Sequence, residues 1–136
     1  MKIFTGPDGH YSIDVKGRTL VFVINGVVDM ELALRSMLEF KIKVTEMGEP
    51  HWASLVDLSC WGLHPPDIVN FIHEFHDWAE KNGQLAEAAV VNSSVLKVVA
   101  RNRLIEKRGK MVHQEYFKTH AEAVEWLQHL YLYEEN

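Results

Sequence analysis

The sequence predicts a single α/β domain, in which a mixed, mostly parallel sheet of five strands is covered by four helices. Segments with strand composition alternate with segments whose apolar residues recur at helical spacing, which is typical of a parallel sheet. A short connection that contains Gly17 joins the first two strand segments, as a hairpin requires. The first strand should therefore be the antiparallel member. A chain of 136 residues has the usual length of one domain.

The five expected strands differ in how they should be buried. Thr19–Ile24 and Trp52–Leu58 are apolar on both faces, which predicts that they lie in the centre of the sheet. Tyr11–Val15 alternates apolar and polar residues, as a half-buried strand does. The complete set is Tyr11–Val15, Thr19–Ile24, Trp52–Leu58, Ala88–Val91 and Met111–Phe117.

Capping residues and helix breakers mark the first two helices. The first helix should start after the N-cap Asp29 and end at Gly48. Its expected inner face consists of Met30, Ala33, Leu34, Met37, Phe40, Val44 and Met47. The second helix should open at Pro65-Pro66, because proline is tolerated in a first turn, and close at Asn82-Gly83.

Hydroxyl residues precede the last two helices. Ser93 or Ser94 should cap a third helix over Val95–Lys107. Thr119 and Glu122 form a capping box for the fourth. The expected organisation is a loose lead-in over residues 1–10, the domain over residues 11–131 and an acidic tail over residues 132–136.

Composition excludes several classes of protein. The chain has 14 Lys and Arg against 19 Asp and Glu, so its formal charge is −5, whereas a nucleic-acid-binding module is normally basic. The single cysteine, Cys60, excludes an internal disulfide, zinc sites with several cysteines and Cys-ligated iron–sulfur clusters. There is no apolar segment long enough for a secretory signal or a membrane span, which favours a cytoplasmic location. His73 and His76 lack a third ligand at fixed spacing, so neither a metal nor a cofactor is expected.

Polar side chains gather where the predicted strands end, which is where open α/β sheets bind ligands. A small apolar or anionic ligand would meet Asn25, Ser59, Cys60, Trp61, His64, Asn92, Ser93 and Ser94 there. Cys60 and His64 could be interpreted as a nucleophile and its base, but no orienting group or oxyanion hole accompanies them. The sequence therefore favours a protein without catalytic residues.

A basic segment interrupts the acidic chain. Residues 95–118 contain seven Lys and Arg residues and two Glu residues. A solvated helix face is one interpretation; a docking patch for an acidic partner, an anionic membrane surface or a second copy is the other. Two leucines lie outside the inner face of the third helix and three cations flank them. The predicted interface consists of Leu96, Lys97, Arg101, Leu104 and Arg108.

The order of elements and several short strings resemble the STAS-like domains, specifically the SpoIIAA-like family related to bacterial anti-sigma-factor antagonists. The strings lie between Tyr11 and Leu130 and are Asn25-Gly26, Leu55-Val56-Asp57-Leu58-Ser59, Ala88-Ala89-Val90-Val91, and Phe117 followed by Glu122-Ala123 and Trp126-Leu127. The resemblance implies a regulatory module that binds a protein partner or itself and is not an enzyme.

One family feature is missing. The resemblance implies a phosphorylated serine at the start of the second helix, but Pro65-Pro66-Asp67 contains no hydroxyl group. The switch is therefore absent, or it has moved to Ser59. The SpoIIAA-like branch is also likened to a lipid-transfer fold, which implies the alternative function: a carrier or sensor of a small ligand.

Overall fold

A computed structural model describes residues 2–5, 9–61, 68–101, 108, 109 and 111–135. Its strands form one six-stranded sheet in the order β1-β2-β3-β4-β5-β6. The strands are β1 (Lys2–Thr5), β2 (Gly9–Lys16), β3 (Thr19–Gly26), β4 (Trp52–Trp61), β5 (Gln84–Val90) and β6 (His113–Phe117). The helices are α1 (Met30–Met47), α2 (Ile68–Lys81), α3 (Ser93–Arg101) and α4 (His120–His129).

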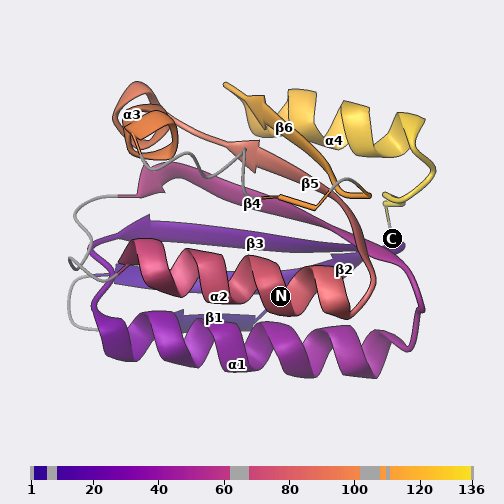
Figure 1. Cartoon of the computed structure of the whole chain (residues 1–136), viewed down its shortest axis with the longest axis horizontal. Coiled ribbons are helices and arrows are strands. Elements are labelled where there is room, and N and C mark those ends of the chain that lie inside the picture. Colours follow the sequence, from indigo (N-terminus) through magenta and orange to yellow (C-terminus); the bar gives the residue numbers. More distant parts are fainter. Residues whose placement is uncertain (1, 6–8, 62–67, 102–107, 110, 136) are drawn as a thin grey trace.

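The predicted mixed, mostly parallel α/β fold is confirmed, but the sheet has six strands and not the five predicted. Strands β3 to β6 pair in parallel, and β2 runs antiparallel to both of its neighbours. The two strands that are apolar on both faces, β3 and β4, lie in the centre of the sheet, as predicted. Figure 1 shows α1 and α2 side by side across one face of the sheet.

The expectation of a loose lead-in over residues 1–10 is wrong. Lys2–Thr5 forms β1, which pairs antiparallel with β2 from Lys2 opposite Ile13 to Thr5 opposite His10. The four-residue strand is short, and the turn residues that follow it dominate the local pattern. The first predicted strand, β2, therefore lies inside the sheet and not at its edge.

The end of the chain is packed against the sheet instead of forming a free acidic tail. Leu132 and Tyr133 are 5% and 7% exposed. The backbone N–H of Arg18 and the hydroxyl of Thr19 both donate to the Leu132 carbonyl, at 2.9 and 2.8 Å. Burial of the Leu132 and Tyr133 side chains stabilises this segment on the sheet, although two glutamates follow them.

Helix α1 has the predicted ends but not the predicted inner face. The Asp29 carboxylate accepts a hydrogen bond from the Leu32 N–H at 2.8 Å, and Gly48 ends the helix with a φ of 70°. Leu34 is 56% exposed, so its predicted place on the inner face is wrong. The face that packs on the sheet includes Leu32, Ala33, Ser36, Phe40 and Val44.

Two details of β5 and α3 also differ from prediction. Strand β5 begins at Gln84 and not at Ala88, because Gln84 and Glu87 find polar partners inside the protein. Asn92, and neither of the two serines that follow it, caps α3: its side-chain oxygen accepts from the Val95 N–H at 2.9 Å. The predicted start of α2 at Pro65-Pro66 and the predicted end of α3 at Lys107 lie outside the described residues.

Each face of the sheet has its own core. The first core lies between the sheet and α1 and α2, and its aromatic centre joins Phe40 to Trp52 and Phe75, with ring centroids 5.6 and 4.8 Å apart. The second lies under α4, whose Ala123 and Leu127 are fully buried against β4 and β5. Successive residues of a strand point to opposite faces of the sheet. Polar side chains of the strands therefore lie either on the α1/α2 face or on the α4 face.

Candidate functional site

Asp57, near the end of β4, holds a polar cluster on the α4 face. Its Oδ1 accepts from the N–H and the hydroxyl of Ser59 at 3.0 and 2.6 Å. Its Oδ2 lies 2.9 Å from Nδ1 of His120, the first residue of α4. Burial raises the pKa of Asp57, but the hydrogen bonds from Ser59 and His120 outweigh it, so the pKa lies below its usual value. Asp57 is thus held as a carboxylate.

Asn92 ties this cluster to α3. Its side-chain amide donates to the Ser59 carbonyl at 3.1 Å, while its oxygen caps the helix. The carboxylate of Asp57 lies between the serine and the histidine, whereas a catalytic triad needs the histidine in the middle. The Ser59 hydroxyl donates to the Asp57 carboxylate and not to a histidine. The geometry therefore joins the ends of β4, β5 and β6 and does not activate a nucleophile.

The structure brings together only part of the ligand site predicted from the sequence. Ser59 and Asn92 are in contact. Asn25 lies opposite Cys60 in the sheet, and its amide is 3.1 Å from Nε2 of His10. Cys60 is exposed.

Among the other predicted site residues, the structure describes Trp61, Ser93 and Ser94. Trp61 is buried and lines an apolar cavity on the α1/α2 face. Ser93 and Ser94 are exposed on the first turn of α3. His64 lies outside the described residues. The sequence does not predict the pairing of Asp57 with His120, because the two residues are 63 positions apart. The one sequence feature that could have indicated a site is the Asp57 carboxylate within an otherwise apolar strand segment.

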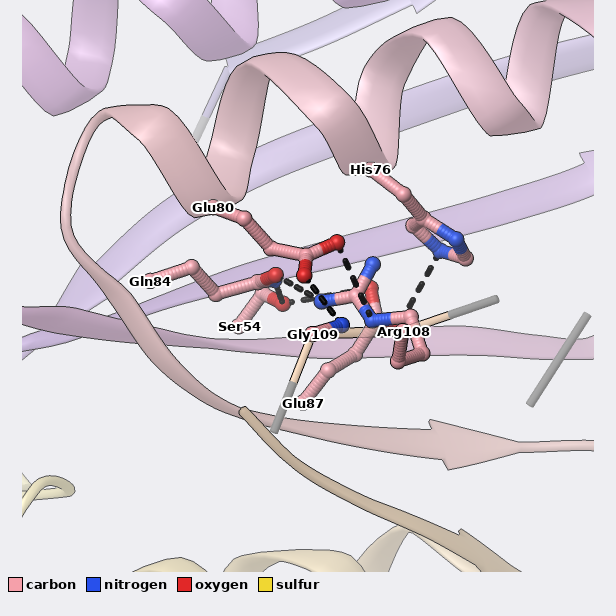
Figure 2. Close-up of polar contacts among 7 residues, drawn as sticks. All are labelled: Ser54, His76, Glu80, Gln84, Glu87, Arg108 and Gly109. Atoms are coloured by element: carbon pink, nitrogen blue, oxygen red, sulfur yellow. Dashed lines mark hydrogen bonds and ion pairs between the residues drawn. The ribbon is translucent and has the colours of Figure 1, made fainter. Parts of the chain in front are cut away.

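A second polar network is buried on the α1/α2 face (Figure 2). Nε2 of His76, on α2, lies 3.4 Å from Oε2 of Glu87, on β5. The Ser54 hydroxyl donates to the other Glu87 oxygen at 3.3 Å and accepts from the Gln84 amide at 3.0 Å. Glu87 is 5% exposed, and a buried carboxylate is stable in its charged form only when such partners compensate for the lost water.

Arg108 belongs to the same network and contacts Gln84 and Glu80. Its guanidinium donates to the Gln84 side-chain oxygen and lies 3.9 Å from Oε2 of Glu80, and the Gly109 N–H donates to Glu80 (Figure 2). Burial raises the pKa of Glu87, but His76 first and then Arg108 outweigh it and lower the pKa to about 2. The network therefore fixes the segment at residues 108–109 onto α2 and β5.

This burial corrects the predicted interface patch. The Arg108 side chain is 3% exposed, so it belongs to the interior and not to a docking surface. Leu96 is 46% exposed and Lys97 is exposed, as the patch requires. The side chain of Arg101 and the whole of Leu104 lie outside the described residues. Self-association through α3 stays a prediction.

The described part of the chain contains neither a cluster of metal-ligating side chains nor a helix suited to crossing a membrane. Among those residues, His, Cys, Asp and Glu form no group of three or more that could hold a metal ion. Within the same residues, no helix is both long enough and apolar enough to cross a membrane.

Comparison with solved structures identifies the fold. No family model matches the sequence, and no curated protein matches it. Among solved structures, the protein is similar to an anti-sigma factor antagonist from Mycobacterium paratuberculosis, with a TM-score of 0.64 and 14% sequence identity. The match covers 92% of this chain and 99% of the other. The chain has the fold of an anti-sigma factor antagonist. The resemblance that the sequence strings indicate is thus confirmed for the fold.

The Asp57 cluster yields a prediction about a switch at Ser59. Ser59→Asp should destabilise the protein more than Ser59→Ala does, because a second carboxylate would stand against Asp57 where a hydroxyl now donates at 2.6 Å. Ser59→Ala should cost about 1 kcal/mol for one lost hydrogen bond. Urea unfolding measures both. A Ser59→Asp variant as stable as wild type would show that the site accepts a phosphate.

Proposed function

We propose that the protein is a non-catalytic regulatory module that binds a protein partner through the outer face of α1. Three large aliphatic side chains carry this proposal: Leu34, Leu38 and Ile42 are 56%, 60% and 41% exposed. Single exposed apolar residues are normal, but a row of them on one helix is typical of an interaction site.

The row has a regular geometry. Its members are four positions apart, so they follow one stripe of the helix over about 12 Å. The stripe lies opposite the buried face that contains Ala33 and Phe40, so packing on the sheet does not explain it. An exposed ion pair, Glu31 with Arg35 at 3.6 Å, lies beside it. An apolar stripe next to charged residues suits a partner helix or groove.

The solved neighbour supports a regulatory role, because an antagonist of an anti-sigma factor acts on another protein. The Asp57 cluster supports the absence of a Ser-His-Asp triad, since its serine donates to the carboxylate and not to the histidine. Residues 65–67 contain no hydroxyl, so binding would not be switched by phosphorylation at that position.

Leu38→Glu should weaken partner binding without unfolding the protein, because a charge in an apolar contact is costly to desolvate while an exposed position tolerates it. The partner is first isolated on wild-type protein in the native host. The dissociation constant of the purified pair is then measured, and we expect it to rise at least about tenfold, as for a residue at the centre of an interface.

Met111→Glu is the matched control, since Met111 is 78% exposed and lies two residues before the edge strand β6, whereas α1 contacts β2 and β3. It should bind like wild type. Equal weakening by both variants, or none by Leu38→Glu, would refute the proposed surface. Sedimentation of wild-type protein shows whether the partner is a second copy.

A further inference from the structure

A cavity of about 140 Å³ lies in the first core, between the sheet and helices α1 and α2. Strands β3 to β6 form its floor, and the two helices cover it. The cavity is partly open to solvent, so a ligand that fills it removes apolar surface from water. A cavity of about 150 Å³ lined by apolar side chains is large enough to hold one benzene ring.

Aromatic rings form much of the wall. Phe22, Phe40 and Phe75 all line the cavity. Phe40 meets Phe75 edge to face, with centroids 4.8 Å apart, and Phe22 at 6.3 Å in the same manner. A further ring inside the cavity would find both ring faces and ring edges to pack against.

One buried polar atom of the wall lacks a partner. His76 is 9% exposed and lines the cavity. Its Nε2 faces Glu87, but its Nδ1 is buried and has no hydrogen-bond partner among the described residues. The Ser36 hydroxyl, also in the wall, already donates to the Ala33 carbonyl at 2.7 Å. An unsatisfied buried nitrogen is unfavourable, so a ligand that supplies a partner gains affinity.

The charges of the wall exclude an anion as the ligand. Glu87 contributes a carboxylate, and no Lys or Arg is among the described residues that line the cavity. Burial, followed by the nearby Glu87, raises the pKa of Tyr116, so this wall residue stays an uncharged phenol. A negative ligand would lie beside the Glu87 carboxylate, with neither Lys nor Arg among the described lining residues to compensate for its desolvation.

We propose that the cavity binds a small, uncharged aromatic molecule that carries one hydroxyl group. The ring occupies the space between Phe22, Phe40 and Phe75, and the hydroxyl bonds to Nδ1 of His76. A hydroxyl both donates and accepts, so it satisfies this nitrogen with or without a proton on it. This site goes beyond the proposed function and does not depend on the outer face of α1.

Phenol and benzene are the probes, titrated into the full chain by calorimetry and followed by two-dimensional NMR. Phenol should bind with a dissociation constant about fivefold lower than that of benzene, as one hydrogen bond to a buried group provides. The amide signals of Phe22 and Ala89 should shift for both probes. In His76→Phe the preference for phenol should disappear while benzene still binds.

A second variant keeps the test valid if loss of the His76–Glu87 pair unfolds the protein. Ala89→Leu fills the cavity from β5 and leaves the polar pair intact, so it should abolish the binding of both probes. Ala121→Leu adds the same side chain to the exposed surface of α4 and should bind like wild type. The proposal is overturned if neither probe binds saturably in the low millimolar range, if benzene binds as tightly as phenol to wild type, or if Ala89→Leu still binds.

Discussion

Trp52→Ala should lower the free energy of unfolding by about 3–5 kcal/mol, the range for a large aromatic side chain deleted from a core. Trp52 is fully buried at the start of β4. Its ring contacts those of Phe40 and Trp78, with centroids 5.6 and 6.2 Å away, and its Nε1 donates to the Asn82 carbonyl at 2.7 Å. One side chain thus joins α1, β4 and the end of α2. Urea unfolding measures the loss.

Trp52→Phe separates the ring from the hydrogen bond. It keeps most of the packing and loses the bond to Asn82, so it should cost clearly less than the alanine variant. If alanine costs less than about 1 kcal/mol, the aromatic centre does not hold the helices to the sheet, and the assignment of the first core is incorrect.

The apolar pattern of the sequence predicts the centre of the sheet but neither its first strand β1 nor the helix surfaces. Strands β3 and β4 are apolar on both faces, so their central place follows from composition alone. Helix α1 has apolar residues around most of its circumference, and the sequence cannot say which of them face the sheet. Leu34 was therefore assigned to the core, although it lies on the exposed stripe.

The buried network of Glu87 and Arg108 could not be predicted from the sequence, because charged residues are normally assigned to the surface. Glu87 interrupts an apolar run, so the pattern placed the start of β5 after it, at Ala88. Its partners His76 and Arg108 are 11 and 21 positions away along the chain, and no local rule connects them. Arg108 was for the same reason assigned to the surface. The sequence predicts Ser59 and Asn92 as site residues because both follow the apolar part of a strand, although β4 extends to Trp61 and so includes Ser59. The carboxylate that organises Ser59 lies deeper in the same strand.

Glu87→Ala should destabilise the protein by about 3–5 kcal/mol at pH 7, because it leaves two charged or polar partners in the interior. The carboxylate is 5% exposed and accepts from Ser54 while it faces His76. Removing it leaves the Arg108 guanidinium without a nearby counter-charge other than Glu80. Thermal unfolding followed by circular dichroism gives the loss, and Glu115→Ala, at an exposed position on β6, is the matched control.

The same carboxylate should make the wild-type protein sensitive to acid. The pKa of Glu87 falls from an ordinary value of 4.5 to about 2 in the folded protein, so folding favours its ionised form. The stabilisation is complete above the unfolded pKa, near pH 4.5, and is lost as the pH falls towards 2. The shift corresponds to about 3 kcal/mol.

Glu87→Gln isolates this contribution, because the amide keeps the shape of the side chain and cannot ionise. Wild type should lose stability more steeply than Glu87→Gln between pH 5 and 2, and the two curves should converge at the acid end as Glu87 becomes protonated. Glu115→Gln should follow the wild-type curve, since that side chain is exposed. Parallel curves for wild type and Glu87→Gln across this range would mean that the network with His76 and Arg108 does not hold Glu87 as a carboxylate.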